Sequence, residues 1–412
     1  MTRGHSMQRR RFLKFTAGAL ATGALRLRFA QAAEANPTTL VVVFQRGGCD
    51  GLNTVVPFGD PYYAGLRPGI GIAPPNAGNP AAALNLNGFL GLHPALAPLH
   101  ALYLDGRLGV LPAVQYPDAS QSHFDGQRWI ESGQPESSID GWLNRYLAQT
   151  SIDAAVRAVS MGGSLAHALR GEVPVATLDD IGNLGFGGGD GEVLVNALAT
   201  VYEQSIDAED RHRAALHQAG LTFLDNLETL AAIDISNYVP ENGAEYPESG
   251  FGTSLRQVAA LIKADVGLEV ATADIGGWDT HSGQGGAQGP QAGRHADFAA
   301  GIAALVTDLG TRMDDVLILS MTEFGRTAEE NASGGTDHGH AAAWFAAGNG
   351  IHGGVHGAWP GLAPANLHDG RYLDHSIDFR DVMAEVLTRF LGVADTGLIL
   401  PGFTPTPIGL IG

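Results

Sequence analysis

The sequence predicts an α/β fold with a mostly parallel sheet and helices on both of its faces. Residues 39–44 (TLVVVF) form an uninterrupted run rich in β-branched residues, which is typical of a parallel strand buried on both faces. Further along the chain, apolar strand-like runs alternate with stretches of helical spacing. This alternation favours a parallel sheet whose strands are connected by helices.

The elements can be assigned in order along the chain. Apolar runs predict strands at 39–44, 108–114, 268–273 and 316–320, followed by another apolar run at 341–347. Helical spacing predicts helices at 93–104, 123–131, 193–233 (a pair), 255–263, 295–313 and 379–391. Residues 60–90, rich in proline, glycine and asparagine, and the glycine-rich residues 182–191 are expected to be loops. No internal repeat or hydrophobic break divides the chain, so one domain is predicted from residue 33 to residue 412.

Composition excludes several classes of protein. The single cysteine, Cys49, rules out an internal disulfide and a thiolate zinc site. The 43 acidic and 24 basic residues give a formal charge of −19, which argues against a broad basic surface that binds nucleic acid. Hydrophobic residues make up 44% and charged residues 16% of the chain, so a folded protein with a large core is expected.

The N-terminus has the pattern of an export signal. Three arginines at 9–11 precede a short apolar run at 15–25, and residues 30–32 match the A-x-A cleavage pattern. Paired arginines indicate the twin-arginine route, so residues 1–32 are predicted to be a signal peptide that binds the twin-arginine translocase. The mature protein is then expected to be periplasmic or extracellular. No run reaches the roughly 18 apolar residues that a membrane helix needs, so no stable membrane span is predicted.

Histidines are concentrated near the C-terminus, where eight of the fifteen lie between His281 and His375. Asp279 and His281 occupy a glycine-flanked turn after the strand at 268–273, and together they can bind one cation. The alternative is an aspartate cap beside a surface histidine. Asp337, His338 and His340 are three ligand-type residues within four positions. They suit a hard or borderline divalent metal and are the strongest local indication of a site.

Three further segments carry candidate residues. Glu323, after the strand at 316–320, is a candidate metal ligand or general base, unless it caps a helix. Arg326 can bind an anion through two N–H groups. Asp50 ends the first strand. Ser122 and Ser120 precede the helix at 123–131, where backbone N–H groups favour a phosphate or sulfate. The competing interpretation makes Ser122 an N-cap and packs the next histidine against its neighbours.

These motifs resemble those of one exported family, domain-of-unknown-function family 1501, over essentially the whole mature chain. The motifs that carry the resemblance are LVVVFQRGGCDGLNTVVP, SQSHFDGQRWIESG, GGWDTHSGQ, MTEFGRT and GTDHGHAAAWFAAGNGIHGG. The family is similar to the alkaline phosphatase and sulfatase superfamily. The resemblance therefore implies an alkaline phosphatase-like α/β domain at 33–412 with a metal-dependent site.

The resemblance also implies roles for individual residues. It implies one or two divalent ions (Zn, Ca, Mg or Mn) and the following ligands: Asp50, Asp279, His281, Glu323, Asp337, and His338 or His340. Ser122 would be the nucleophile, with Ser120 as the alternative. Phe324 stands where the superfamily has a histidine, so one imidazole is missing. The sulfatase cysteine motif is absent, since Cys49 is followed by DGLN and cannot be a formylglycine precursor of that type.

These expectations favour an exported metal-dependent hydrolase of phosphate or sulfate esters, with a small molecule or a polymer as substrate. Ser122 would attack in line, and Arg326 would neutralise the developing charge. The ligands other than Asp50 are expected to converge in one site. Two alternatives stay open: a metal-binding but non-catalytic envelope binding or assembly protein of the same fold, and a metal-centred oxidoreductase, because these ligands also suit iron or manganese.

Overall fold

The computed structural model describes residues 38–135, 139–150, 156–179 and 237–412, together with isolated positions between these ranges. Most of the predicted elements can therefore be compared with the structure. The predicted signal peptide at 1–32 and the glycine-rich loop at 182–191 lie outside the described residues, and so does nearly all of the helix pair predicted at 193–233.

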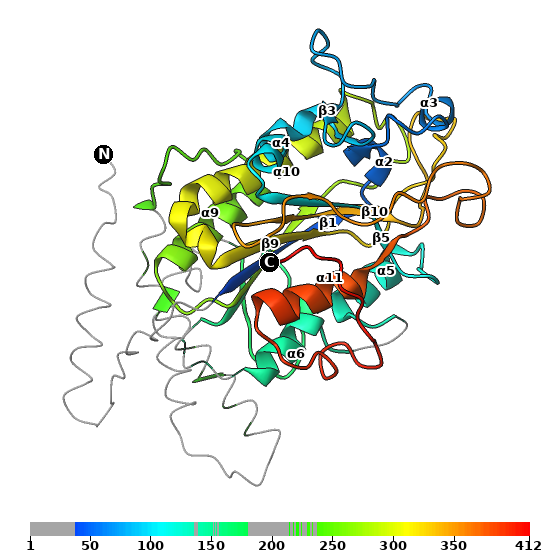
Figure 1. Cartoon of the computed structure of the whole chain (residues 1–412). Coiled ribbons are helices and arrows are strands. Elements are labelled where there is room, and N and C mark those ends of the chain that lie inside the picture. The colour runs from blue at the N-terminus through cyan, green and yellow to red at the C-terminus, as the bar shows by residue number, and fades with distance from the viewer. Residues whose placement is uncertain are drawn as a thin grey trace, which may run out of the picture. The chain divides into compact units, whose positions relative to one another are not determined.

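A mostly parallel sheet forms the centre of the unit that spans residues 36–412 (Figure 1). Its strands follow the spatial order β11-β5-β10-β9-β1-β8-β6-β7, and β12 pairs with β5. The strand bounds are β1 Thr39–Arg46, β5 Leu108–Gln115, β6 Ala158–Met161, β7 Ala176–Leu178, β8 Val270–Gly276, β9 Val316–Met321, β10 Ala342–Ala347, β11 Gly354–Val355 and β12 Ile377–Asp378. The central strand β1 pairs in parallel with β8 and β9, whereas β10 is antiparallel to β9 and β5. The predicted mostly parallel sheet is confirmed.

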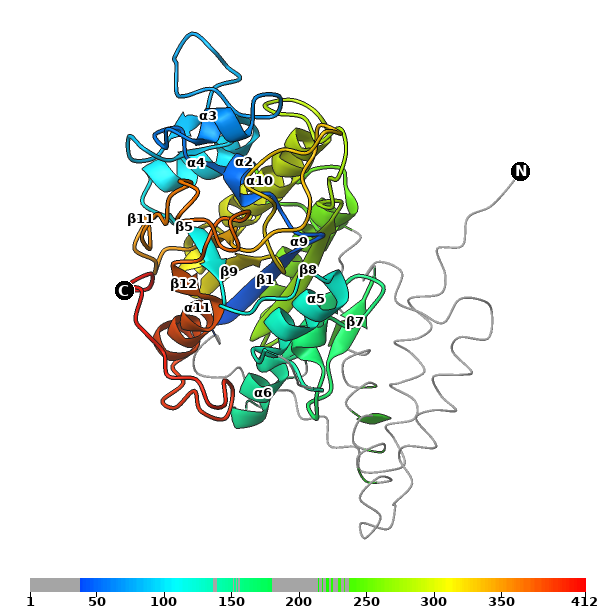
Figure 2. The same cartoon turned by 90° about the vertical axis from the view of Figure 1, so that its right-hand side faces the viewer.

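Helices cover both faces of this sheet, as Figures 1 and 2 show. One face packs against α4 (Ala97–Leu104), α9 (Gly250–Lys263) and α10 (Pro290–Leu309). The other face packs against α5 (His123–Ser132), α6 (Trp142–Gln149) and α11 (Phe379–Glu385), which continues as a π-helical turn at Val386–Phe390. The helices predicted at 93–104, 123–131, 255–263, 295–313 and 379–391 are confirmed, with ends that shift by a few residues, whereas α6 was not predicted.

The sequence of β1 explains why the sheet has two apolar faces. Side chains alternate along a strand, so Val41 and Val43 enter one core while Leu40, Val42 and Phe44 enter the other. All five are at most 3% exposed. Burial on both faces is what the unbroken β-branched run predicts.

Local residues define the ends of α5, the helix that carries part of the site. Ser122 caps its N-terminus by accepting a hydrogen bond from the Asp125 N–H at 3.5 Å. Gly133 ends the helix with a φ of 68°, a left-handed conformation that is favourable mainly for glycine. The helix predicted at 123–131 is therefore confirmed to within one residue.

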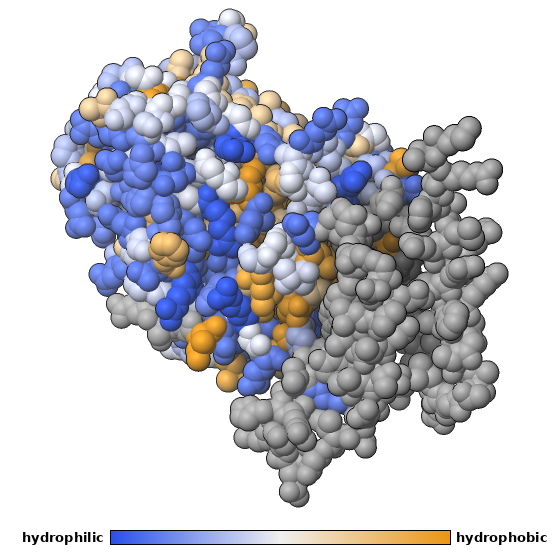
Figure 3. Space-filling view, turned by 180° about the vertical axis from the view of Figure 1, so that it is seen from behind, coloured by the Kyte–Doolittle hydropathy of each residue, from blue (hydrophilic) through white to orange (hydrophobic). Residues whose placement is uncertain are grey.

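Short elements make up much of the remaining described chain. A small sheet has the order β2-β4-β3, with bounds Val55–Val56, Gly91–Leu92 and Leu84–Asn85. The short helices are α2 (Gly51–Thr54) and α3 (Tyr63–Leu66), and the 3-10 turns are Pro94–Leu96, His167–Leu169 and Gly310–Asp314. Among the described residues, no helix is long and apolar enough to cross a membrane. Figure 3 shows a face on which hydrophilic side chains predominate.

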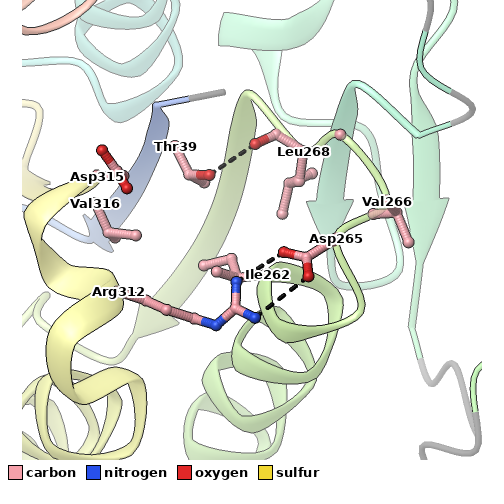
Figure 4. A pocket seen from close by; sticks show the side chains of 9 residues that line it. Thr39, Ile262, Asp265, Val266, Leu268, Arg312, Asp315 and Val316 are labelled. Carbon is pink, nitrogen blue, oxygen red and sulfur yellow. Dashed lines mark hydrogen bonds and ion pairs between the residues drawn. The ribbon is translucent and has the colours of Figure 1, made fainter. Parts of the chain in front are cut away.

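A small cavity lies at the edge of the sheet where β1 and β9 begin. At the edge where β1 and β9 begin, Thr39 donates a hydrogen bond to the Leu268 carbonyl at 2.7 Å, and Arg312 pairs with Asp265 at 2.7 Å (Figure 4). The cavity beside them has a volume of about 30 Å³, which leaves room for only one or two water molecules. The histidines and carboxylates predicted as a site lie at the opposite edge.

Candidate metal site

The site lies at the edge where the parallel strands end. The turn after β8 carries Asp279 and His281, and the segment after β9 carries Glu323. Because β10 is antiparallel to β9, it begins at this same edge, and the residues that precede it (335–340) reach the same place. The loop after β5 leads into α5, whose first residue is His123. Four segments that are distant in sequence therefore meet at the ligand-binding edge of an α/β sheet.

Three imidazole rings surround the Asp279 carboxylate. Ligand atoms of His123, Asp279 and His338 lie within 4.8 Å of one another. His123 Nε2 is 3.5 Å from Asp279 Oδ2, and His338 Nε2 is 3.2 Å from Asp279 Oδ1. His281 Nε2 lies 3.0 Å from Asp279 Oδ1 and 3.1 Å from His338 Nε2. The three Nε2 atoms therefore converge on one carboxylate.

Each of these rings has its own hydrogen-bond acceptor on its outer side. The Nδ1 atoms of His123, His281 and His338 lie 2.8, 3.0 and 2.8 Å, respectively, from Glu323 Oε1, Asp337 Oδ1 and the Gln121 carbonyl oxygen. A neutral ring that donates from Nδ1 keeps the lone pair of Nε2 for another partner. Metal-binding histidines in proteins are oriented in this way by an outer carboxylate or carbonyl.

The donor set fits a divalent metal of the zinc type. Two ligands bound at 2.0–2.1 Å to one tetrahedral ion are roughly 3.3–3.4 Å apart. The separations that involve Asp279 range from 3.0 to 3.5 Å. In addition, His123 Nε2 is buried and has no hydrogen-bond partner within the described structure. Imidazole nitrogens with a carboxylate oxygen suit zinc and other borderline ions.

Arg326 lies beneath this cluster and fixes Asp279, whereas the sequence predicted that it binds an anion. Its side chain is fully buried and donates to the carbonyls of Gly47, Gly48 and Trp278 and to Asp279 Oδ1, the last at 2.7 Å. Burial raises the pKa of the Asp279 carboxyl, but the hydrogen bond and charge of Arg326 bring it below its ordinary value. The guanidinium is therefore committed to the protein and not to a substrate.

Glu323 was predicted as a metal ligand, but the structure places it behind His123. Its carboxylate is buried and accepts hydrogen bonds from His123 Nδ1, the Gly47 N–H and Gln127 Nε2, each at 2.8–2.9 Å. Burial raises the pKa of Glu323, and these donors more than offset that, so its pKa is lowered. The same hydrogen bond raises the pKa of His123, while burial lowers the pKa of His338. Glu323 is thus a positioning residue.

Phe324 occupies a place where the family resemblance implies a histidine. Its ring centroid lies 4.9 Å from that of His123 and 4.9 Å from that of His338. The side chain is fully buried. It therefore forms an apolar wall beside two candidate ligands and supplies no donor of its own.

Asp50 does not join the cluster, although the sequence predicted it as a metal ligand. Both of its oxygens contact Arg67, at 2.5 and 2.9 Å, and Gln284 Nε2 donates to Oδ2 at 2.7 Å. Asp50 and Arg67 are both fully buried. In this structure the Asp50 carboxylate stabilises a buried arginine, because two of its lone pairs are already used by that guanidinium.

The predicted nucleophiles flank the site in sequence. Ser122 is the N-cap of α5, as the competing interpretation proposed, and its Oγ accepts from a backbone N–H of that helix. Ser120 Oγ accepts from the Ser122 N–H at 3.1 Å. The residue between them, Gln121, contacts His338 through its carbonyl. The role of either serine as a nucleophile stays a prediction.

His340 belongs to a second group of close ligand-type side chains, with Asp374 and His375. His340 Nε2 is 3.3 Å from His375 Nδ1 and 3.9 Å from Asp374 Oδ1. Burial, with the nearby imidazoles, lowers the pKa of His340 to about 3. The His340 ring is therefore neutral at physiological pH.

Sequence reasoning missed three residues that the structure brings together with the predicted ones. His123 was treated as part of a helix start, although an imidazole at the first position of a helix after a strand faces the ligand edge. Asp374 and His375 form an adjacent pair just before β12 and were given no role. That adjacency is the signal that could have identified them.

Comparison with known proteins gives distant structural similarities. The C-terminal periplasmic domain of EcEptC from Escherichia coli, in complex with Zn, is 9% identical over 91% of this chain and 89% of that chain, with a TM-score of 0.40. The lipoteichoic acid synthase LtaP from Listeria monocytogenes is 9% identical over 88% and 74%, with a TM-score of 0.38. A protein in the alkaline phosphatase superfamily from Vibrio parahaemolyticus is 11% identical over 89% and 70%, with a TM-score of 0.37. At this distance neither the substrate nor the metal of those proteins transfers to this chain.

Sequence comparison is more specific. A search of curated proteins found no match. One family model matches residues 105–401, a range that contains His123, Asp279 and both histidine groups. Because this match covers well over half of the sequence, the chain belongs to the family described as Protein of unknown function (DUF1501).

Proposed function

We propose that this chain is an exported, metal-dependent hydrolase of phosphate or sulfate esters. The observation that supports this function is the convergence of three imidazole Nε2 atoms on Asp279, with each Nδ1 held from outside. His123, Asp279 and His338 would hold the ion, with His281 beside them. A divalent ion at this place acts as a Lewis acid toward an oxygen of the phosphoryl or sulfuryl group.

The chain's own residues prepare the site for an anionic ester. The side chains of Asp279 and His281 are 44% and 45% exposed, so the cluster is open to solvent on one side. Arg326 holds the Asp279 carboxylate in its charged form from the buried side. Phe324 excludes water from the rear of the two rings that it contacts.

Room for the organic part of the ester exists beside Asp337. A cavity of about 250 Å³ opens there, lined in part by Asn331, Leu367 and Arg371. Arg371 is exposed and supplies a positive charge at this rim. The carboxylates of Glu329, Glu330 and Asp337 also line this cavity, so it suits an organic part that is polar or positively charged better than one with a further negative charge.

The hydroxyl that attacks is proposed to be that of Ser122, with Ser120 as the alternative. Both serines flank Gln121, whose carbonyl holds His338, so both hydroxyls belong to the loop that builds the cluster. A serine nucleophile would form a covalent ester with the transferred group and release the alcohol, and water would then hydrolyse that ester. Export by the twin-arginine route, inferred from the arginines at 9–11, is part of the same proposal.

A second candidate function has specific support: a metal-binding envelope protein without hydrolytic activity. Arg326 is buried and fully engaged, and Ser122 serves as a helix cap. Ser120 Oγ accepts a hydrogen bond from the Ser122 N–H, so all three side chains predicted to act in catalysis have structural partners. In this second candidate function, the protein binds the ion but catalyses no hydrolysis.

Generic substrates can separate these candidates. Full-length protein exported through its own leader would be loaded with Zn²⁺, Mg²⁺, Ca²⁺ or Mn²⁺ and tested on nitrophenyl phosphate, bis-nitrophenyl phosphate and nitrophenyl sulfate. Metal-dependent turnover that is lost in His338→Ala and kept in His352→Ala supports the hydrolase; His352 is exposed and outside both groups. Metal binding that depends on His338, without turnover of any ester, supports the second candidate. Absence of metal binding overturns both.

A further inference from the structure

A second group of ligand-type side chains has no member in common with the first cluster. It contains His340, Asp374 and His375, whose ligand atoms also lie within 4.8 Å of one another. His340 comes from the segment just before β10, and the other two come from the loop just before β12. His340 is more than thirty positions from the other two residues. Their proximity therefore results from the tertiary fold and not from closeness in sequence.

The separations fit one small cation. His340 Nε2 lies 3.3 Å from His375 Nδ1, close to the roughly 3.3–3.4 Å between neighbouring ligands of a tetrahedral zinc ion. Asp374 Oδ1 lies 3.1 Å from His375 Nδ1 and 3.9 Å from His340 Nε2. Two imidazole nitrogens and one carboxylate oxygen form a donor set that zinc prefers.

The surroundings hold these ligands in place and leave one side open. The His340 side chain is 2% exposed and stacks on the His368 ring, with centroids 3.9 Å apart and planes inclined by 6°. The backbone N–H of His375 donates a hydrogen bond to Asp374 Oδ1 at 2.8 Å, which fixes the position of that carboxylate. The side chains of Asp374 and His375 are 42% and 22% exposed, so an ion can enter from solvent.

We propose that His340, Asp374 and His375 bind a second divalent cation of the zinc type, separate from the site at Asp279. An ion there would link the loop that precedes β12 to the start of β10. That loop also carries Arg371, which lines the cavity beside Asp337, and Tyr372, whose hydroxyl donates to Gln121 Oε1 at 3.4 Å. The second cation would therefore hold one wall of the cavity and would not touch the ester.

The number of bound zinc ions tests this proposal without using turnover. Full-length protein and its variants would be dialysed against Zn²⁺ and analysed for bound metal, with circular dichroism to confirm the fold. We expect two zinc ions per wild-type chain, one in His375→Ala, one in His338→Ala, none in the double variant and two in His352→Ala. Asp374→Asn, which changes a partly exposed residue with little change of shape, should also bind one.

The outcomes separate this site from the first one. Wild-type stoichiometry in folded His375→Ala and Asp374→Asn would overturn the second site. So would a wild-type protein that binds a single zinc ion and loses it in His338→Ala. A single zinc ion that is lost in His375→Ala but kept in His338→Ala supports the second site and contradicts the first.

Discussion

The two histidine groups use the same kinds of side chain but are anchored in different ways. Around Asp279, every ring has a separate outer acceptor at Nδ1, and the carboxylate is paired with a buried arginine. Around Asp374, the rings of His340, His368 and His375 all lie beside one carboxylate, and His368 Nε2 also lies 3.8 Å from Asp369 Oδ2. The first group is thus oriented by the protein, whereas the second depends on its own members and on any ion that it binds. Outer hydrogen bonds distinguish a preorganised metal site from a set of neighbours.

Replacing Arg326 should cause the largest loss of stability, because Asp279 would lose the buried arginine that pairs with it. Arg326→Met leaves the carbonyls of Gly47 and Gly48 without their donor and removes the buried charge that holds Asp279. We expect a loss of about 3 kcal/mol in unfolding free energy, the lower end for breaking a buried charge pair, because Asp279 is partly exposed. Urea unfolding would measure it.

The matched control for this variant is Arg371→Met, which changes an exposed arginine of the same region. Its unfolding free energy should stay within about 0.5 kcal/mol of wild type. Equal losses for the two variants would mean that the guanidinium beneath Asp279 contributes no more than a surface arginine.

Removal of metal should affect the two groups unequally. A chelator withdraws the binding free energy, which is about 2.7 kcal/mol per site when free zinc is a hundred times the dissociation constant. Since the described part of the chain gives His340 and His375 no separate outer acceptor, their loop should loosen, and limited proteolysis within residues 362–375 should accelerate. Mass spectrometry of the fragments would locate the cuts.

Variants assign that proteolysis to one group. His375→Ala should be cut in this loop at the chelated rate even with zinc present, and His338→Ala should behave as wild type there. Faster cutting at 362–375 in zinc-loaded His338→Ala would show that the two groups are not independent.

Replacing an outer hydrogen-bond acceptor should lower zinc affinity more when that acceptor is buried. Glu323→Gln weakens the hold on His123 and should lower zinc affinity of the first site by roughly 10–100-fold, the usual range for such partners. Asp337, which orients His281, is 51% exposed, so Asp337→Asn should cost at most about tenfold, the lower end of that range. Competition with a coloured zinc chelator would measure both. Equal effects would show that burial of the acceptor is unimportant.

The sequence was sufficient for five strands of the sheet (β1, β5, β8, β9 and β10) and for part of the site, whereas β6, β7, β11 and β12 were not predicted. The β-branched run of β1 predicts a strand that is buried on both faces. A sheet that contains such a strand is expected to be mostly parallel. Asp279, His281 and His338 were found because they lie where strands end or begin at one edge. These inferences use only local patterns and the geometry of a parallel sheet.

The remainder of the site depends on contacts between distant segments. Nothing local shows that Asp50 will contact Arg67, or that Arg326 will be buried and donate to four backbone carbonyls, because arginine side chains are usually exposed. His338 and His340 are two positions apart and serve different groups, so proximity in sequence was misleading. Loop paths decide such contacts, and loop paths are the least predictable part of an α/β fold.

The smallest expected effect concerns His368, which stacks on His340 without belonging to the three close ligands. Its Nδ1 lies 3.7 Å from Asp374 Oδ1, and its side chain is 29% exposed. Stacking of aromatic rings contributes about 0.5–1.5 kcal/mol, and the lower value applies to a ring that is partly exposed. His368→Ala should therefore keep two zinc ions and lower the affinity of the second site by only about twofold. His100→Ala, remote in sequence from both groups, is the control and should change neither quantity. Loss of a whole zinc ion in His368→Ala would make this ring a fourth ligand, and the second group would then be as completely built as the first.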